Sequence, residues 1–166
     1  MNILSKLTAL LLILISMQAL AADLRVGFVD LERILRESAP AVKAAQKIEK
    51  EFAAREDAIK KLTGQVRELQ DYLEKKGAGL SNNERRSKER ELSNQSAELQ
   101  RVQREFREDL NQRKNEELSV LLERANKAIQ AIAENEKYDL ILQEAVYRNP
   151  KIDITDKVLK ALGSEK

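Results

Sequence analysis

The sequence predicts a mainly α-helical fold with a small β-containing body: a long antiparallel helical hairpin, here called the arm, attached to a few short strands. Three observations predict it. Ala, Glu, Lys, Leu and Arg make up 93 of the 166 residues, a composition typical of long helices and coiled coils. Apolar residues recur at heptad spacing along two central stretches. Segments with β-strand character occur near the two ends of the chain.

The composition also excludes several kinds of chemistry. Charged residues make up 35% of the chain and aromatic residues 4%, which disfavours a large globular core. The chain has no Cys, His or Trp, so disulfides, thiolate nucleophiles, imidazole catalysis and the usual zinc ligands are absent. We therefore expect no enzyme, no cofactor and no metal site. A net charge of +2 lacks the basic excess of a nucleic-acid-binding protein.

Residues 1–21 have the pattern of a secretory signal peptide. Lys6 supplies the positive start, residues 7–15 form an apolar run, and Ala19-Leu20-Ala21 is a small-residue cleavage site. The run is shorter than the roughly 20 apolar residues that a membrane-spanning helix needs. We predict cleavage between Ala21 and Ala22, and hence an exported mature chain.

Residues 40–136 are predicted to form the arm, with its tip near 77–81. Pro40 suits the first turn of the outgoing helix. Gly77 and Gly79 are expected to end that helix in the left-handed conformation, and Ser81 with Glu84 forms a capping box for the return helix. The return helix, 82–136, would be about 28 Å longer than the outgoing one at 1.5 Å per residue. Its excess length must dock against the two ends of the chain.

A register about Gly79 places residues whose numbers sum to 158 opposite each other. Four apolar pairs, the arm seam, follow from this register: Ile48 with Leu110, Phe52 with Phe106, Ile59 with Leu99, and Val66 with Leu92. Arg55 falls opposite Gln103, a polar layer in an apolar seam. Two interpretations stay open: the arm bends there, or the arginine side chain reaches past a well-packed seam to water.

The body comprises residues 22–39 and 137–166. A strand is predicted over residues 24–30, followed by a short helix over 31–37 that Asp30 caps. One interrupted strand or two short strands are predicted over 139–144 and 145–148. A final helix, capped by Asp153, follows. About fifty residues with few aromatics are too few for a stable independent domain, so we expect oligomerisation through the strands. The residues expected at that contact are Val26, Phe28, Val29, Leu140, Ile141, Leu142 and Val146.

The two ends, VGFVDLERILRESAPAVKAAQKIEKEF and YDLILQEAVYRNPKIDITDKVLKAL, resemble the signature ends of the OmpH-like family. The likeness covers essentially the whole mature chain. It implies a homotrimer in which strands of three protomers form a central oligomerisation barrel and three arms surround a cavity. It also implies a periplasmic chaperone that holds unfolded outer-membrane β-barrel proteins without ATP. A structural coiled-coil spacer or adaptor of the cell envelope, without client activity, is the alternative.

The tip carries the cations Lys75, Lys76, Arg85, Arg86, Lys88 and Arg90, and residues 75–90 contain two acids, Glu84 and Glu89. This excess of four positive charges predicts contact with anionic lipid, lipopolysaccharide phosphates or acidic client segments. The alternative is a solvated helix tip that its charge keeps soluble.

Overall fold

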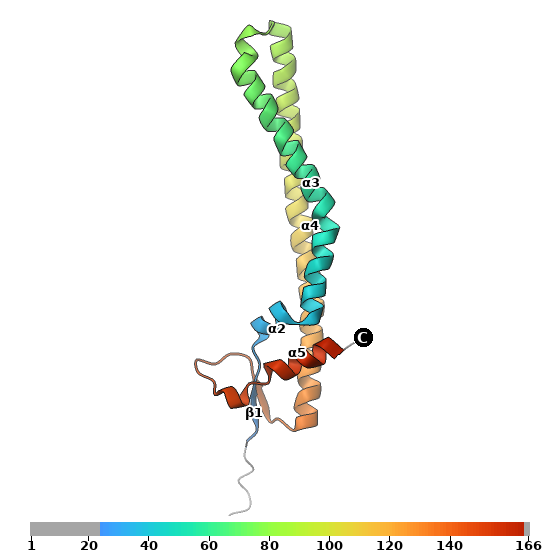
Figure 1. Cartoon of the computed structure of the whole chain (residues 1–166), viewed down its shortest axis with the longest axis vertical. Helices are drawn as coiled ribbons and strands as arrows, with labels where there is room; N and C mark the ends of the chain where they lie inside the picture. The colour runs from blue at the N-terminus through green and yellow to red at the C-terminus, as the bar shows by residue number, and fades with distance from the viewer. Residues whose placement is uncertain (1–23, 165–166) are drawn as a thin grey trace, which may run out of the picture.

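The computed structural model describes residues 24–164, so the predicted cleavage site at Ala21 and Ala22 lies outside the described residues. In chain order the elements are β1 (Val26–Phe28), α2 (Leu31–Glu37), α3 (Ala39–Lys76), η1 (Gly77–Gly79), α4 (Asn82–Glu136), β2 (Leu140–Leu142), η2 (Pro150–Ile152) and α5 (Thr155–Ser164). Helices α3 and α4 run side by side as a long antiparallel hairpin, and the remaining elements gather at one end of it (Figure 1). The predicted mainly helical fold with a small β body is confirmed.

Local capping explains where the arm helices begin. Ser38 caps α3, since its Oγ accepts a hydrogen bond from the backbone N–H of Ala41 at 3.3 Å, and Pro40 lies in the first turn. The capping box of α4 is present as predicted: Glu84 N–H donates to Ser81 Oγ at 3.3 Å, and Ser81 N–H donates to Glu84 Oε2 at 3.0 Å.

Both arm helices end at the predicted residues, Lys76 and Glu136, but the backbone conformation that closes them differs from the prediction. Gly77, Ala78 and Gly79 form a 3₁₀ turn, and none of the described glycines has a positive φ, so the expected left-handed closure at Gly77 or Gly79 is wrong. A 3₁₀ turn also provides hydrogen bonds to terminal carbonyls: the N–H of Leu80 donates to the carbonyl of Gly77 at 3.4 Å. The left-handed residue is instead Lys137, with φ 54° and ψ 50°, which ends α4.

Strands β1 and β2 pair in parallel, with Val26 opposite Leu140 and Phe28 opposite Leu142. A parallel pair needs a long crossover, and the whole arm provides it. Residues 145–148, predicted as strand, are not strand in the protomer. A strand requires a neighbour for its backbone N–H and C=O groups, and residues 24–164 offer none to this segment.

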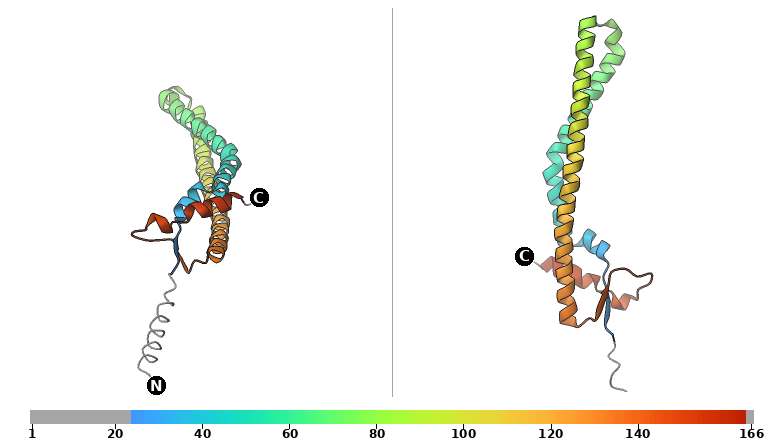
Figure 2. Two further views of the ribbon diagram at one scale, coloured as in Figure 1. Left: turned by 60° about the horizontal axis from the view of Figure 1, so that its bottom comes forward. Right: turned by 180° about the vertical axis from the view of Figure 1, so that it is seen from behind.

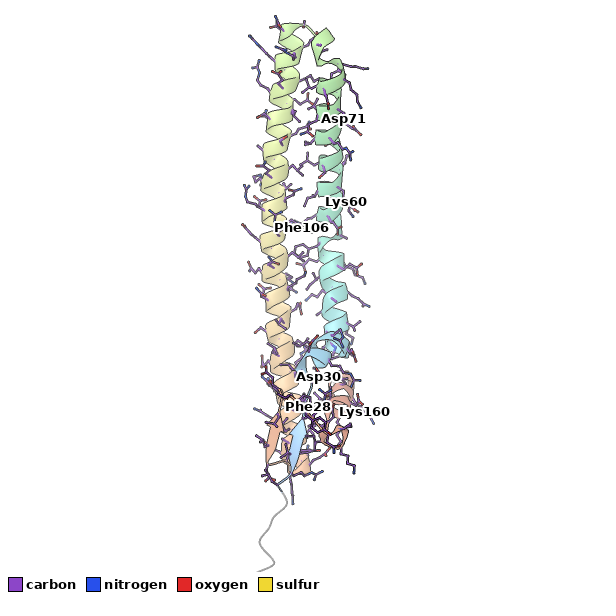
Figure 3. All side chains as sticks on the ribbon, turned by 90° about the vertical axis from the view of Figure 1, so that its left-hand side faces the viewer. Phe28, Asp30, Lys60, Asp71, Phe106 and Lys160 are labelled. Carbon is purple, nitrogen blue, oxygen red and sulfur yellow. The ribbon has the colours of Figure 1, made fainter. Side chains whose placement is uncertain are left out.

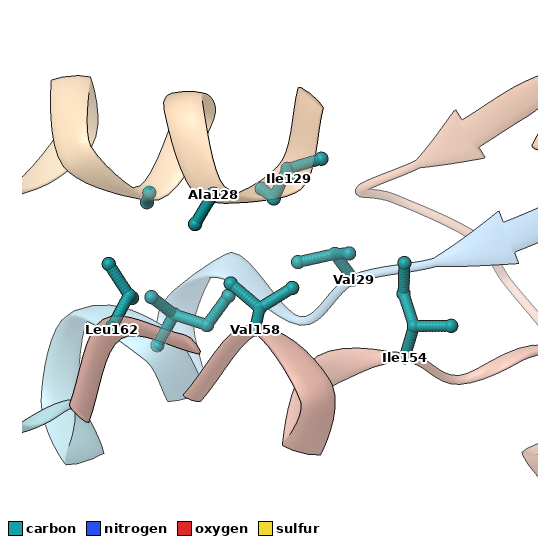
Figure 4. Packing of buried hydrophobic residues seen from close by; sticks show 8 residues of the cluster. Val29, Ala128, Ile129, Ile154, Val158 and Leu162 are labelled. Carbon is teal, nitrogen blue, oxygen red and sulfur yellow. The ribbon is translucent and has the colours of Figure 1, made fainter. Parts of the chain in front are cut away.

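The core of the body lies where α4, α2, α5 and the chain after β1 meet (Figure 4). Val29, Ile34 and Val158 are fully buried there, together with Ala125 and Ile129 from α4. The last turns of α4 therefore pack against both ends of the chain, which is what the length difference between the arm helices predicts. Figure 2 shows α4 continuing into the body past the start of α3.

No helix in the described range, 24–164, is both long enough and apolar enough to cross a membrane.

Candidate functional site

An apolar groove lies at the base of the arm, where the heptad faces of α3 and α4 come together beside α2. It has a volume of about 600 Å³. Its apolar lining comes mainly from Leu35, Ala45, Ile48, Phe52, Phe106, Leu110, Leu118 and Leu121. Apart from Leu35 of α2, these residues lie three, four or eight positions apart along each arm helix, so the same stripe that holds the hairpin together also extends onto one open side of it.

Two aromatic rings form the centre of the groove. The rings of Phe52 and Phe106 meet edge to face, with centroids 5.6 Å apart and planes at 82°. Such a pair contributes about 0.5–1.5 kcal/mol beyond its buried area. Phe52 is buried, whereas Phe106 is half-buried and lies between the two helices in Figure 3. The floor of the groove is therefore formed by two aromatic rings in direct contact.

Charged side chains form the rim of the groove. Four of them are acidic (Glu49, Glu56, Asp57 and Glu117) and two are lysines (Lys60 and Lys114). Lys60 Nζ lies 3.0 Å from Glu56 Oε1 and 3.7 Å from Asp57 Oδ1, and the hydrogen bond to Glu56 is the main cause that raises the pKa of Lys60. An apolar floor with a charged, solvated rim can bind apolar segments while remaining soluble.

Ion pairs between the helices fix the register below and above the aromatic pair. Arg113 Nε lies 3.1 Å from Glu51 Oε2, and Lys47 Nζ lies 3.2 Å from Glu117 Oε1. Arg55 Nη1 lies 2.8 Å from Asp109 Oδ2, and its guanidinium stands 5.6 Å from the ring centroid of Phe52. The arginine in the polar layer thus binds a surface carboxylate.

The predicted seam residues occupy the inner side of the arm to different degrees. Ile48 and Leu110 line the basal groove together, beside the Phe52–Phe106 pair. Further along the arm Val66 is buried, whereas Ile59, Leu92 and Leu99 are half-buried. The seam is therefore tighter at some layers than at others.

The six predicted tip cations are partly neutralised. Lys75 lies 3.6 Å from Asp71, Arg85 3.6 Å from Glu89, and Lys88 2.8 Å from Glu91. The hydrogen bond to Glu91 is the main cause that raises the pKa of Lys88. Residues 71–91 carry six cations and five acids, so the expected local excess of four charges falls to one. The count missed Asp71, Glu74 and Glu91 because helix geometry brings residues three or four apart together.

The predicted oligomerisation residues divide into two groups. Phe28 and Val29 are buried within the protomer, and Val26 and Ile141 are half-buried, so their side chains already have partners. The exposed ones are Leu140, Leu142 and Val146, with exposed fractions of 47%, 37% and 111%. Tyr147, which the sequence reasoning missed, is 82% exposed beside Val146. In a strand of three residues, the alternation of side chains along the sequence did not show which of them are buried and which are exposed.

The sequence reasoning also missed Leu35, Ala41 and the groove role of Leu118 and Leu121. Leu118 and Leu121 continue the heptad pattern of the return helix, which was the available signal. Leu35 lies on α2, and its arrival at the groove depends on the tertiary packing of the body. Among residues 24–164 there is no cluster of three or more metal-ligating side chains.

These features place the chain in a class of proteins: helical hairpins that offer an apolar binding surface rather than a reaction centre. The profile of the family described as "Outer membrane protein (OmpH-like)" matches residues 25–162. The chain belongs to the OmpH-like family. Its relatives are chaperones and not enzymes, and the chain is not an enzyme.

Several curated relatives are similar over most of their length. The chain is 25% identical over 145 residues to "Chaperone protein Skp" of Blochmanniella pennsylvanica, covering 86% of this chain and 87% of the relative. It is 26% identical over 144 residues to the protein of the same name from Photorhabdus luminescens, covering 86% and 87%. "Skp-like protein" of Pseudomonas aeruginosa is 23% identical over 144 residues, covering 86% of each chain.

A solved structure has the same fold. The crystal structure of an OmpH-like protein from Caulobacter crescentus superposes with a TM-score of 0.70 at 17% sequence identity, covering 84% of this chain and 83% of that one. At this identity the likeness concerns the fold alone.

Proposed function

We propose that this OmpH-family chaperone is an ATP-independent periplasmic holdase that binds unfolded outer-membrane β-barrel proteins and prevents their aggregation. The observation that carries the proposal is the basal groove: an apolar surface with an aromatic pair at its floor and a charged rim, on a chain whose relatives are chaperones. Residues 1–21 act as the signal peptide that directs export. A holdase needs no energy source, because binding alone lowers the concentration of free unfolded client.

The experiment is suppression of aggregation when a urea-denatured outer-membrane barrel is diluted into buffer containing the mature chain. The test variant is Leu118→Glu, which places a charge on the groove wall at a residue that is 41% exposed and so tolerates the change. Burial of part of a leucine side chain contributes about 1 kcal/mol, so the variant should need roughly three to tenfold more protein for the same protection.

Val120→Glu is the matched control. It lies two residues further along the same helix, is 46% exposed, and does not line the groove. Protection by Val120→Glu should equal that of the unchanged chain. Equal protection by both variants would remove the groove from the proposal, and no protection by the unchanged chain would favour the structural spacer.

We propose further that the chain works as a homotrimer joined through its body. Support comes from the exposed Leu140, Leu142 and Val146, and from a two-stranded sheet whose β2 edge is open in the protomer. Sedimentation of the mature chain should give three times the protomer mass, and Leu142→Lys should lower it. A protomer mass for the unchanged chain would contradict this proposal.

Contact of the arm tip with anionic lipid or lipopolysaccharide is also proposed, with less charge available than the sequence predicted. Lys76 and Arg86 belong to the tip, and Lys76 Nζ stands 5.9 Å from the ring centroid of the partly exposed Tyr72. Changing Lys75, Lys76, Arg85 and Arg86 to Gln should reduce binding to anionic vesicles. The same charge change at the exposed Lys43, Lys50, Arg104 and Arg107 should not. Equal binding by both variants would exclude the tip.

A further inference from the structure

The two walls of the basal groove differ in the size of their side chains. The wall on α3 contains four alanines, and two of them, Ala45 and Ala53, are exposed. The wall on α4 carries large apolar side chains, among them Leu110 and the 41% exposed Leu118. Small side chains let the backbone of a neighbouring segment approach closely, and the large ones opposite give that segment apolar area to cover.

The groove has the length of a helix of about four to five turns. Its lining runs from Ala41 to Lys60 on α3, about 28 Å at 1.5 Å per residue, and from Phe106 to Leu121 on α4, about 22 Å. Side chains on one face of a helix repeat about every 5.4 Å, which matches the ridges of α3 and α4. Side chains on one face of a strand repeat about every 6.8 Å and do not match. The lining therefore favours a helix over an extended segment.

Two exposed charges on opposite walls of the groove form no ion pair within residues 24–164: Glu49 on α3 and Lys114 on α4. The other charged residues of the rim all take part in ion pairs; they are Glu56, Asp57, Lys60 and Glu117. A complementary helix has a basic flank toward Glu49 and an acidic flank toward Lys114. Reversing the direction of such a helix exchanges its flanks, so the two charges favour one direction.

We propose that the basal groove binds an amphipathic helix of a partner protein as the third helix of a bundle, in the direction set by Glu49 and Lys114. The binding mode is a helix in an apolar groove, and it uses the ridge packing that already joins α3 and α4. The inference rests on the proposed function, in which the groove is open to clients, and it adds to the barrel clients a class of segment that is helical when bound.

The first test uses two fluorescent 18-residue peptides of identical composition. In one, leucines follow heptad spacing between a lysine flank and a glutamate flank; in the other, leucines alternate with polar residues. A free helix of this length is marginal in water, so helix formation on binding adds to the circular dichroism signal. The heptad peptide should gain this signal and bind the mature chain at least about tenfold more tightly. Equal binding, tighter binding of the alternating peptide, or no binding of either would overturn the inference.

Ala53→Gln tests the small-residue wall without changing the charge. Its longer polar side chain would keep the peptide backbone away from α3, so the dissociation constant should rise by at least about fivefold. Ala54→Gln is the matched control, because Ala54 is the next residue, is also exposed, and does not line the groove. Both variants keep a good helix former, so the arm should fold normally. Equal effects of the two variants would contradict helix docking at this wall.

The role of the two charges is tested by exchanging them, as Glu49→Lys with Lys114→Glu, which leaves the net charge unchanged. The chain has no cysteine, so Lys43→Cys, at an exposed site near the body end of the arm, accepts a single spin label. With a second label at the N-terminus of the heptad peptide, the distance between the labels should change by about 20 Å on charge exchange, since the helix reverses along the groove. An unchanged distance would refute the stated direction and partner chemistry.

These outcomes separate the inference from the proposed function. Protection of a denatured barrel protein without binding of the heptad peptide would leave the holdase function in place and refute the helix site. Binding of the heptad peptide without protection of the barrel protein would do the reverse.

Discussion

At the scale of single residues, Lys137 shows how one backbone angle ends a helix. It is the one described non-glycine residue with a positive φ, and its N–H closes the last turn of α4. A side chain is unfavourable in this conformation, whereas glycine adopts it readily. Lys137→Gly should therefore raise the free energy of unfolding by about 1 kcal/mol. Urea denaturation of the mature chain measures it.

The control variant in the same helix, Lys127→Gly, should lower the free energy of unfolding instead of raising it. Lys127 lies in the interior of α4, where glycine costs about 1 kcal/mol relative to a good helix former. If both glycine variants destabilise the chain equally, the left-handed end of α4 is wrong.

The capping box at Ser81 is a second local feature. Ser81→Ala removes the acceptor for the N–H of Glu84 and should cost about 1 kcal/mol at the start of α4. The hydrogen bonds from Ser81 are the main cause that lowers the pKa of Glu84, so that pKa should rise toward its ordinary value in the variant. Amide hydrogen exchange at residues 82–86 should accelerate, while exchange at residues 125–129 should not. Uniform acceleration would indicate global unfolding instead.

At the scale of elements, the aromatic pair holds the basal half of the arm. Phe52→Ala removes a buried ring and its contact with Phe106, and should lower the free energy of unfolding by about 3 kcal/mol. Phe52→Leu keeps most of the apolar volume and should cost less than about 1.5 kcal/mol. Thermal denaturation of both variants measures the difference, and equal losses would contradict the claim that apolar volume at this layer sets the stability.

The sequence predicts these helices well because their signals are local. The heptad spacing, Pro40, Ser81 and Glu84 act within a few residues, and α4 begins and ends where those signals indicate. The strand over 145–148 could not be judged in the same way, because a strand depends on a partner, and the described part of the chain provides none there. Similarly, Leu35 reaches the groove because α2 packs near the distant residues Leu118 and Leu121 of α4.

At the scale of the whole molecule, the charge network predicts how stability depends on pH. Hydrogen bonds lower the pKa of Glu98, through Arg101, and of Glu136, through Lys157, below the ordinary value of 4.5. These groups stabilise the folded chain above about pH 4.5, and this stabilisation is lost as the pH falls through their folded-state pKa values. The chain has no histidine, so the thermal midpoint should be flat between roughly pH 6 and 8 and should fall below about pH 4.5. A transition near pH 6.5 would contradict this account.

The packing of the body also determines how the arm is oriented. A body core built from both chain ends and the last turns of α4 sets the direction in which each hairpin leaves it. In the proposed homotrimer, which is joined through the body, the basal groove of each protomer would lie at the end of the arm next to the body. Client binding and self-association are therefore expected to occur together.

The most direct test is native mass spectrometry of the mature chain, alone and after addition of one denatured outer-membrane barrel protein. The account predicts three copies of the chain alone, and three copies with one client after addition. Single copies, or three copies that never acquire the client, would contradict it.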